Sequence, residues 1–112
     1  MTSRKGDAER LGDVLRSIER LDEILEAGYE AFASSWIHQS ASLHELETIG
    51  EACGELSPAI RRLHAEIRWD EMRGFATIGR QRRWQVRPEL LWNALEELPS
   101  LRRKIVRVES LS

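Results

Sequence analysis

The amino-acid sequence predicts a small all-α protein, an antiparallel bundle of four to five helices in a single domain that spans residues 1–112. Apolar residues recur at three- and four-residue steps along most of the chain, which places them on one face of each helix. No segment shows the alternation of apolar and polar residues that a half-buried strand requires. With 112 residues, 41% of them hydrophobic, the chain has enough apolar side chains for one core.

The first predicted helix has the clearest apolar stripe, which is typical of a helix that faces a core. Charged side chains occupy much of its remaining surface, and Gly28 is a natural stop. Between Tyr29 and Ser42 the pattern weakens, and this stretch fits a short helix that three serines disfavour. The stripe of the first helix consists of Leu11, Val14, Leu15, Ile18, Leu21 and Leu25.

A second long helix is predicted from about Gln39 or Ser42 to Leu56. Gly50 and Gly54 lie four residues apart within it. Glycine costs about 1 kcal/mol relative to alanine inside a helix, so these two need a compensating reason. We expect a neighbouring backbone to approach the helix closely at both positions.

Ser57 and Pro58 together indicate a helix start, with the serine as N-cap and the proline at the first helical position. The short helix that they open is followed by a third long helix, predicted from Trp69 to about Arg83.

The last helix is predicted to begin at Pro88. Its apolar stripe continues past Pro99, which has no amide donor and whose ring clashes with the preceding turn. We therefore expect a kink near Pro99. The stripe consists of Leu91, Ala94, Leu95, Leu98, Leu101, Ile105 and Val108.

The net charge of −2 conceals an asymmetry between the two halves of the chain. Residues 1–56 carry 5 basic and 12 acidic side chains, whereas residues 57–112 carry 12 basic and 7 acidic ones. Such a separation can create two faces that steer assembly or attract a polyanion. Alternatively, the two halves attract each other across one bundle, and charge alone favours this second interpretation.

The composition also bears on the cellular compartment. Cys53 is the single cysteine, which excludes an internal disulfide and fits a reducing environment. No motif surrounds it, so we expect a buried, small apolar side chain and not a nucleophile. The chain has neither the run of about 18 apolar residues that a membrane helix needs nor the apolar stretch of a signal peptide. These features predict a cytoplasmic protein without membrane contact.

Four segments in order resemble the HepT-like branch of the HEPN superfamily, across residues 10–108. They are RLGDVLRSIERLDEIL, LETIGEACGELS, IRWDEMRGF and VRPELLWNALEELPSLRRKI. The resemblance implies a helical fold, homodimers, and a partnership with minimal nucleotidyltransferases in prokaryotic toxin–antitoxin pairs. It also implies ribonuclease activity, because family members carry an Arg-Asn pair, three residues, a His, one residue and a Tyr.

That motif is absent here. An ungapped alignment from Gly74 places Ala76 at the Arg, Thr77 at the Asn, Gln81 at the His and Arg83 at the Tyr. A histidine can manage the 2′-hydroxyl proton near neutral pH, and an arginine can stabilise the charged phosphorane. Gln81 does not titrate and Ala76 carries no charge, so no intact catalytic site is expected. The tyrosine that the resemblance makes the target of nucleotide transfer is missing too.

An arginine cluster with one tryptophan follows the third predicted helix and suggests RNA or nucleotide binding, through phosphate contacts and base stacking. Arginines near a helix C-terminus also interact with the helix dipole, and their stems cover apolar surface, so a structural role remains open. The spacing of His38 and His44 does not suit a helical metal pair, and no metal or cofactor is expected. The cluster consists of Arg73, Arg80, Arg82, Arg83, Trp84 and Arg87.

Together these patterns predict a HepT-like protein of toxin–antitoxin type that is catalytically inactive and acts as a dimeric binding partner, with a minimal nucleotidyltransferase as the candidate partner. The alternative is an RNA-binding protein, or a metal-independent ribonuclease that uses a rebuilt arginine-rich site.

Overall fold

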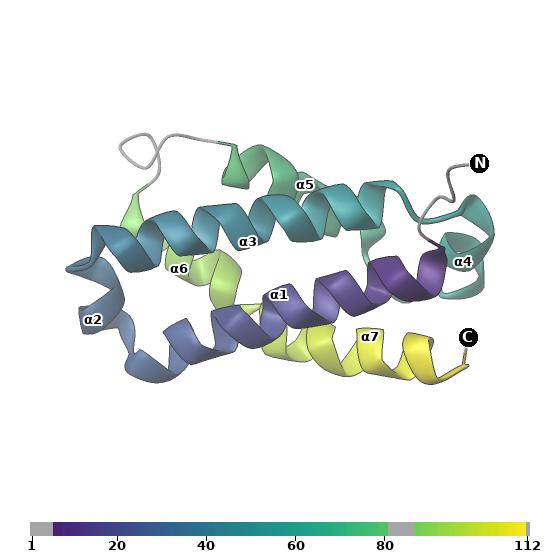
Figure 1. Ribbon diagram of the computed structural model, residues 1–112, viewed down its shortest axis with the longest axis horizontal. Coiled ribbons are helices and arrows are strands. Elements are labelled where there is room, and N and C mark those ends of the chain that lie inside the picture. Colours follow the sequence, from purple (N-terminus) through teal and green to yellow (C-terminus); the bar gives the residue numbers. More distant parts are fainter. Residues whose placement is uncertain (1–5, 81–86, 112) are drawn as a thin grey trace.

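A computed structural model describes the backbone of residues 6–80 and 87–111. Over this part of the chain the fold is an all-α bundle, as predicted. α3 lies in the middle, with α5 along one side and α1 along the other, and α7 packs on α1 (Figure 1). The longer helices are α1 (Asp7–Ala27), α3 (Trp36–Gly54), α5 (Trp69–Gly79), α6 (Pro88–Glu96) and α7 (Leu98–Leu111); the short ones are α2 (Tyr29–Ala33) and α4 (Pro58–Leu63).

The core is continuous from one end of the bundle to the other and draws on both long and short helices. Most of the predicted α1 stripe is fully buried, whereas Leu15 and Leu25 lie partly exposed at its margin. Cys53 is buried as expected, and burial raises the pKa of its thiol to about 12. The largest fully buried side chains include Leu11, Ile18, Leu21, Phe32, Leu46, Ile49, Met72 and Leu95.

The start of α3 differs from the prediction. The Ser35 hydroxyl accepts a hydrogen bond from the amide of His38 at 3.1 Å, so the helix begins at Trp36 and not at Gln39 or Ser42. Serine disfavours a helix interior but stabilises its first turn, because its side chain satisfies an amide that has no intrahelical partner. The serines that weakened the pattern therefore include the one that starts the helix.

The predicted start of α4 is confirmed. The Ser57 hydroxyl accepts from the amide of Ile60 at 3.3 Å, and Pro58 takes the first helical position. The carboxylate of Asp7, at the start of α1, accepts hydrogen bonds from the Ser57 hydroxyl at 2.6 Å and the Ser57 amide at 3.0 Å. These bonds, the hydroxyl bond above all, lower the pKa of Asp7, and they tie the beginning of α1 to α4.

α5 is shorter than predicted, since it ends at Gly79 and Arg80 forms its C-cap. The predicted end, Arg83, lies outside the described residues. The kink near Pro99 is confirmed: α6 ends at Glu96 and α7 begins at Leu98. Pro99 thus occupies the first turn of α7, where its missing amide leaves no hydrogen bond unmade.

Ion pairs join the acidic first half of the chain to its basic second half. Arg102 of α7 lies 3.6 Å from Glu19 and 3.8 Å from Asp22 of α1. Arg80, after α5, lies 3.6 Å from Glu51 of α3. Part of the charge asymmetry between the two halves of the chain is therefore neutralised by ion pairs within the bundle.

No helix in the described ranges is both long enough and apolar enough to span a membrane.

Candidate functional site

Ala76 and Thr77, which the alignment predicts to occupy the first two motif positions, lie on α5 beside a groove that α5 forms with the second half of α3. The groove has a volume of about 540 Å³. Ala76 is 5% exposed and lies at its base, whereas Thr77 is exposed on its rim.

Small residues bring α3 and α5 into close contact beneath this groove. A Cβ atom added to Gly50 would lie 2.2 Å from the amide nitrogen of Ala76 and 2.6 Å from its Cβ. A Cβ on Gly79 would lie 2.4 Å from the carbonyl oxygen of Leu43 and from the amide of Glu47. The close approach predicted at Gly50 is confirmed, and Gly79 is a second one that sequence reasoning missed.

The prediction for Gly54 is wrong. The atoms nearest to an added Cβ there belong to the flexible Arg73 side chain, and the closest lies 3.7 Å away, which is ordinary contact. α5 approaches α3 closely at Gly50 and, through Gly79, at Leu43 and Glu47, whereas near Gly54 the groove between the two helices is open.

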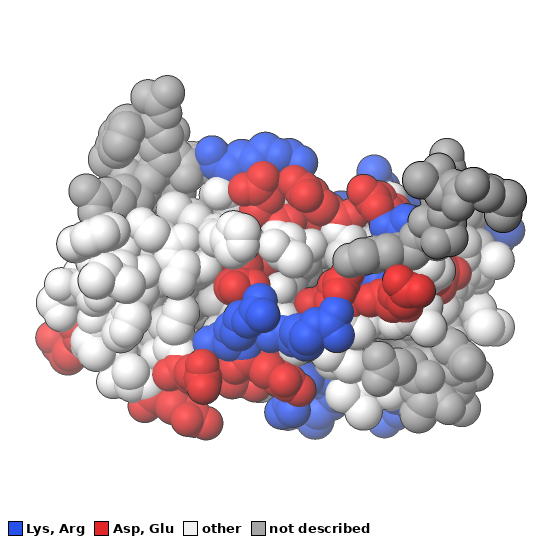
Figure 2. Space-filling view, viewed as in Figure 1, with Lys and Arg blue, Asp and Glu red and all other residues white. Residues whose placement is uncertain are grey.

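The charged side chains that line the groove are paired with one another or with α1. Arg80 lies 3.6 Å from Glu51, Arg73 lies 3.7 Å from Asp70, and Glu55 pairs with Arg10 of α1. In Figure 2 basic side chains along the upper edge, where α5 lies in Figure 1, adjoin acidic ones. Among the described residues, three carboxylates and two guanidinium groups line the groove, so this part of it is slightly acidic and has no unpaired cation.

The match to known proteins extends over most of the chain, including the helices that form this groove. The family model "Ribonuclease HepT-like" matches residues 14–108. This chain belongs to the HepT-like ribonuclease family. A probable ribonuclease HepT of Thermococcus cleftensis is 30% identical over 107 residues, which cover 94% of this chain and 97% of that relative. No solved structure matched the chain.

In this HepT-like chain the structure describes only some of the predicted motif positions, because Gln81 and Arg83 lie outside the described residues. Of the predicted arginine cluster, Arg73 and Arg80 line the groove. Arg87 is the N-cap residue of α6, a helix that packs against α1, α2, α3 and α7. Arg82 and Trp84 also lie outside the described residues, so RNA binding by the cluster stays a prediction.

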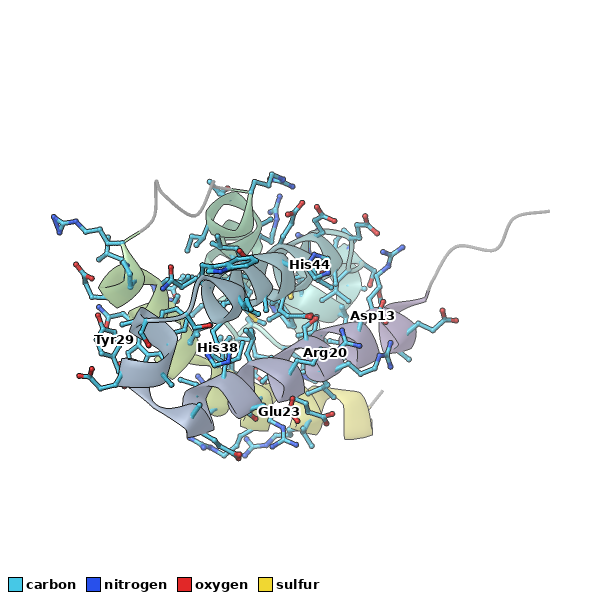
Figure 3. All side chains as sticks on the ribbon, turned by 60° about the vertical axis from the view of Figure 1, so that its left-hand side comes forward. Asp13, Arg20, Glu23, Tyr29, His38 and His44 are labelled. Atoms are coloured by element: carbon cyan, nitrogen blue, oxygen red, sulfur yellow. The ribbon has the colours of Figure 1, made fainter. Side chains whose placement is uncertain are left out.

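None of the histidines lines the groove. Figure 3 shows His38 and His44 well apart on α3. His64 is buried at the end of α4, where its backbone carbonyl accepts a hydrogen bond from the Trp69 indole at 3.1 Å. In the part of the chain that is described, no three His, Cys, Asp or Glu side chains converge as metal ligands would.

The other side of α3 holds a buried carboxylate that sequence reasoning did not single out. Glu45 is 8% exposed and accepts a hydrogen bond from the Ser17 hydroxyl of α1 at 2.8 Å. The guanidinium of Arg20, which is labelled in Figure 3, lies 3.4 Å from both of its oxygens. With these donors the Glu45 carboxylate fastens α1 to α3.

Proposed function

We propose that this HepT-like protein is catalytically inactive and acts as a homodimeric binding partner, with a minimal nucleotidyltransferase as the second component of a toxin–antitoxin pair. The observation that carries the proposal is Ala76. It occupies the position of the motif arginine, and its methyl group is packed against Gly50 at the base of the groove.

The groove supports this proposal through what its side chains can do. Metal-independent RNA cleavage needs a group that moves the 2′-hydroxyl proton and a free cation that stabilises the phosphorane. Each contributes roughly 10²- to 10³-fold or more to the rate. Arg73 and Arg80 are engaged by carboxylates, and the Thr77 hydroxyl does not titrate near neutral pH. A phosphate entering the groove would also meet three carboxylates.

A large uncharged surface supports the dimer. The chain has no Asp, Glu, Lys or Arg between Ala31 and His44, and Trp36 and Ile37 are 61% and 60% exposed. This surface is the uncharged area on the left of Figure 2, where α2 and the start of α3 lie in Figure 1. A two-fold interface places a surface against its own copy, so the absence of charge avoids repulsion between like charges.

The dimer is tested by size-exclusion chromatography with light scattering at micromolar concentration. We expect twice the chain mass for the natural protein and a shift toward the monomer in Ile37→Glu, which places two carboxylates in the interface. Leu63→Glu is the matched control, because Leu63 is 75% exposed and lies on α4. A natural protein that is strictly monomeric contradicts the dimer.

Catalysis is tested with labelled single-stranded and tRNA-like RNA in the presence of EDTA. We expect no cleavage by the natural protein and partial activity in the double variant Ala76→Arg, Gln81→His. Cleavage that co-purifies with the natural protein and disappears in Arg83→Ala would contradict inactivity and favour a ribonuclease with a rebuilt site.

A further inference from the structure

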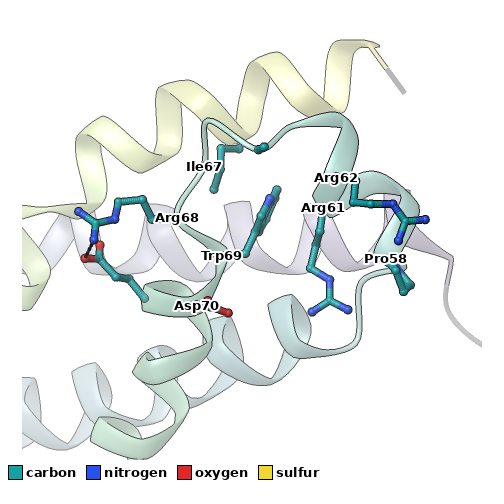
Figure 4. A pocket seen from close by; sticks show the side chains of 9 residues that line it. Pro58, Arg61, Arg62, Ile67, Arg68, Trp69 and Asp70 are labelled. Carbon is teal, nitrogen blue, oxygen red and sulfur yellow. Dashed lines mark ion pairs between the residues drawn. The ribbon is translucent and has the colours of Figure 1, made fainter.

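A second hollow lies at the corner where α4 turns into α5, and it differs in charge from the motif groove. Its volume is about 570 Å³, within the range of small-molecule sites. Arg61, Arg62 and Arg68 line it together with Trp69 (Figure 4). In that view Trp69 lies between Arg61 and Arg68.

Two of these arginines have no counter-charge. Arg68 lies 3.1 Å from Glu71, the pair drawn with a dashed line in Figure 4, and the remaining carboxylate at the rim, Asp70, pairs with Arg73. The guanidinium groups of Arg61 and Arg62 make neither an ion pair nor a hydrogen bond within the described ranges. The corner therefore presents two uncompensated guanidinium groups at one hollow, whereas the motif groove presents none.

The frame that carries these arginines is fixed. Ser57 caps α4 and is held by the carboxylate of Asp7, so the helix that bears Arg61 and Arg62 is anchored to α1. At the other wall the Trp69 indole donates to the carbonyl of His64 at 3.1 Å. A preorganised site of this kind loses little entropy when a ligand binds.

Trp69 decides the class of ligand. The side chain is buried, with 7% of the residue exposed, so it forms the floor of the hollow and has no free face on which a base could stack. The groups left to a ligand are guanidinium donors, whose forked geometry suits phosphate oxygens. The corner therefore suits a phosphate group and offers no stacking surface for a base.

The position of Arg61 and Arg62 in the last turn of α4 also suits the helix dipole. That interaction requires only that they lie near the helix end, and a helix of six residues has a small dipole. It does not account for two adjacent arginines that both face the same hollow without an acidic partner.

We propose that the corner between α4 and α5 is a phosphate-binding site, in which Arg61 and Arg62 bind the phosphate oxygens and Arg68 adds positive charge at the rim. The phosphate belongs either to a small phosphorylated molecule or to the backbone of a single-stranded RNA. The corner adjoins the motif groove at Asp70, but its three arginines do not line that groove, so the proposal does not depend on whether the groove is active.

The test uses the full chain with two probes, sodium pyrophosphate in calorimetry and a fluorescein-labelled uridine 12-mer in anisotropy titrations. The key variant is Arg61→Gln, Arg62→Gln. Its matched control is Arg103→Gln, Lys104→Gln, which removes the same charge from two adjacent exposed residues on α7. Bonds to charged groups are worth about 1.5 kcal/mol or more each, so we expect at least about tenfold weaker binding in the key variant. The control should stay within about twofold of the natural protein.

Salt dependence adds a second readout. For the 12-mer, the slope of log K against log salt concentration should fall by about 1.4 in the key variant, because each phosphate contact on a single strand contributes about 0.7. Glu71→Gln should bind either probe more tightly, since it releases Arg68 from its carboxylate partner.

If the natural protein binds pyrophosphate and the key variant does not, the site is assigned to small phosphorylated molecules. If only the 12-mer is bound, and the key variant loses that binding, the site is assigned to RNA backbone. Either result supports the site. No binding of either probe, or equal losses in the key and control variants, overturns it. We expect the dimer mass and the cleavage assay to be unchanged by these substitutions, so failure here is distinguishable from failure of the proposed function.

Discussion

The two sides of α3 are packed by opposite means. Toward α5 the closest contacts are made by glycine, alanine and backbone, with no room for a further carbon atom at Gly50 or Gly79. Toward α1 the contact contains a carboxylate, Glu45, together with the Ser17 hydroxyl that donates to it. At these positions α3 therefore meets one neighbour through the close fit of small residues and the other through a buried polar contact within an apolar interface.

The difference shows how each interface fixes the register of its helices. On the α5 side register is set by steric exclusion, because only glycine permits the observed backbone distance. On the α1 side it is set by hydrogen bonding, because a shift of one turn would leave the buried Glu45 carboxylate without its donor. The interface with α5 should therefore be destabilised by added atoms, and the interface with α1 by the loss of a hydrogen-bonding group.

The largest effect should come from adding one methyl group on the α5 side. Gly50→Ala and Gly79→Ala should each lower the free energy of unfolding by about 3 kcal/mol or more, because the new Cβ meets backbone atoms that cannot rotate away. Urea denaturation at fixed protein concentration measures this.

The control for these variants is Gly74→Ala on α5, where an added Cβ meets no atom within 4 Å. It should raise stability by up to about 1 kcal/mol through helix propensity. If all three glycine variants changed stability alike, helix propensity and not close approach would explain the effect of the glycines on stability.

On the α1 side, the removal of a partner should cost less. Glu45→Ala leaves the buried Ser17 hydroxyl without its acceptor and opens space in the interface, at a cost of about 2 kcal/mol. Glu45→Gln keeps an acceptor for Ser17 and should lose no more than half as much. Equal losses in the two variants would show that packing of the side chain, and not the hydrogen bond, holds this interface.

The periodicity of apolar residues was sufficient to predict the fold, and the predictions that failed concern single positions. The apolar stripes correctly placed the cores of α1 and α3 and the buried Cys53, because burial follows from a repeating pattern. The start of α3 was missed because serine acts in opposite ways at a cap and in a helix interior. Among the glycines, Gly50 and Gly54 look identical in sequence, and only the divergence of α5 separates them.

The candidate sites were less accessible to sequence reasoning. The motif positions Ala76 and Thr77 could be assigned by resemblance, yet the charge balance of their groove depends on carboxylates far away in the chain, such as Glu51. The corner arginines, Arg61 and Arg62, carry no functional signal in the sequence, because they lie in a six-residue helix without a motif. Whether a cation has a partner is a tertiary property, and charge counts along the sequence do not contain it.

A second polar contact, between Ser57 and Asp7 at the end of the bundle, tests whether the contribution of Glu45 to stability depends on its burial. Ser57→Ala removes the α4 cap and the hydroxyl bond to Asp7, at a cost of about 1 kcal/mol. The pKa of Asp7 is lowered in the folded state, so its contribution to stability is present above its ordinary value of 3.8 and is lost as the pH falls through the folded value.

Urea denaturation of the natural protein and of Ser57→Ala between pH 2 and 6 measures this contribution. The difference between the two proteins should shrink toward the acid end, where Asp7 is protonated in both. A difference that stays constant over the range would mean that the cap alone, without the Asp7 carboxylate, holds α4.

The smallest effects should come from the exposed cations on the two sides of α3. Arg20 lies 3.4 Å from the carboxylate of Glu45, and Arg80 lies 3.6 Å from that of Glu51. Both guanidinium side chains are more than half exposed, at 62% and 57%, and such pairs contribute about 0.5 kcal/mol. Arg20→Ala and Arg80→Ala should therefore change stability by similar small amounts that diminish in 0.5 M salt. A loss in Arg20→Ala as large as that in Glu45→Ala would mean that the buried carboxylate depends on its charged neighbour. In that case the α1 side of α3 would be an ion-paired interface and not a hydrogen-bonded one.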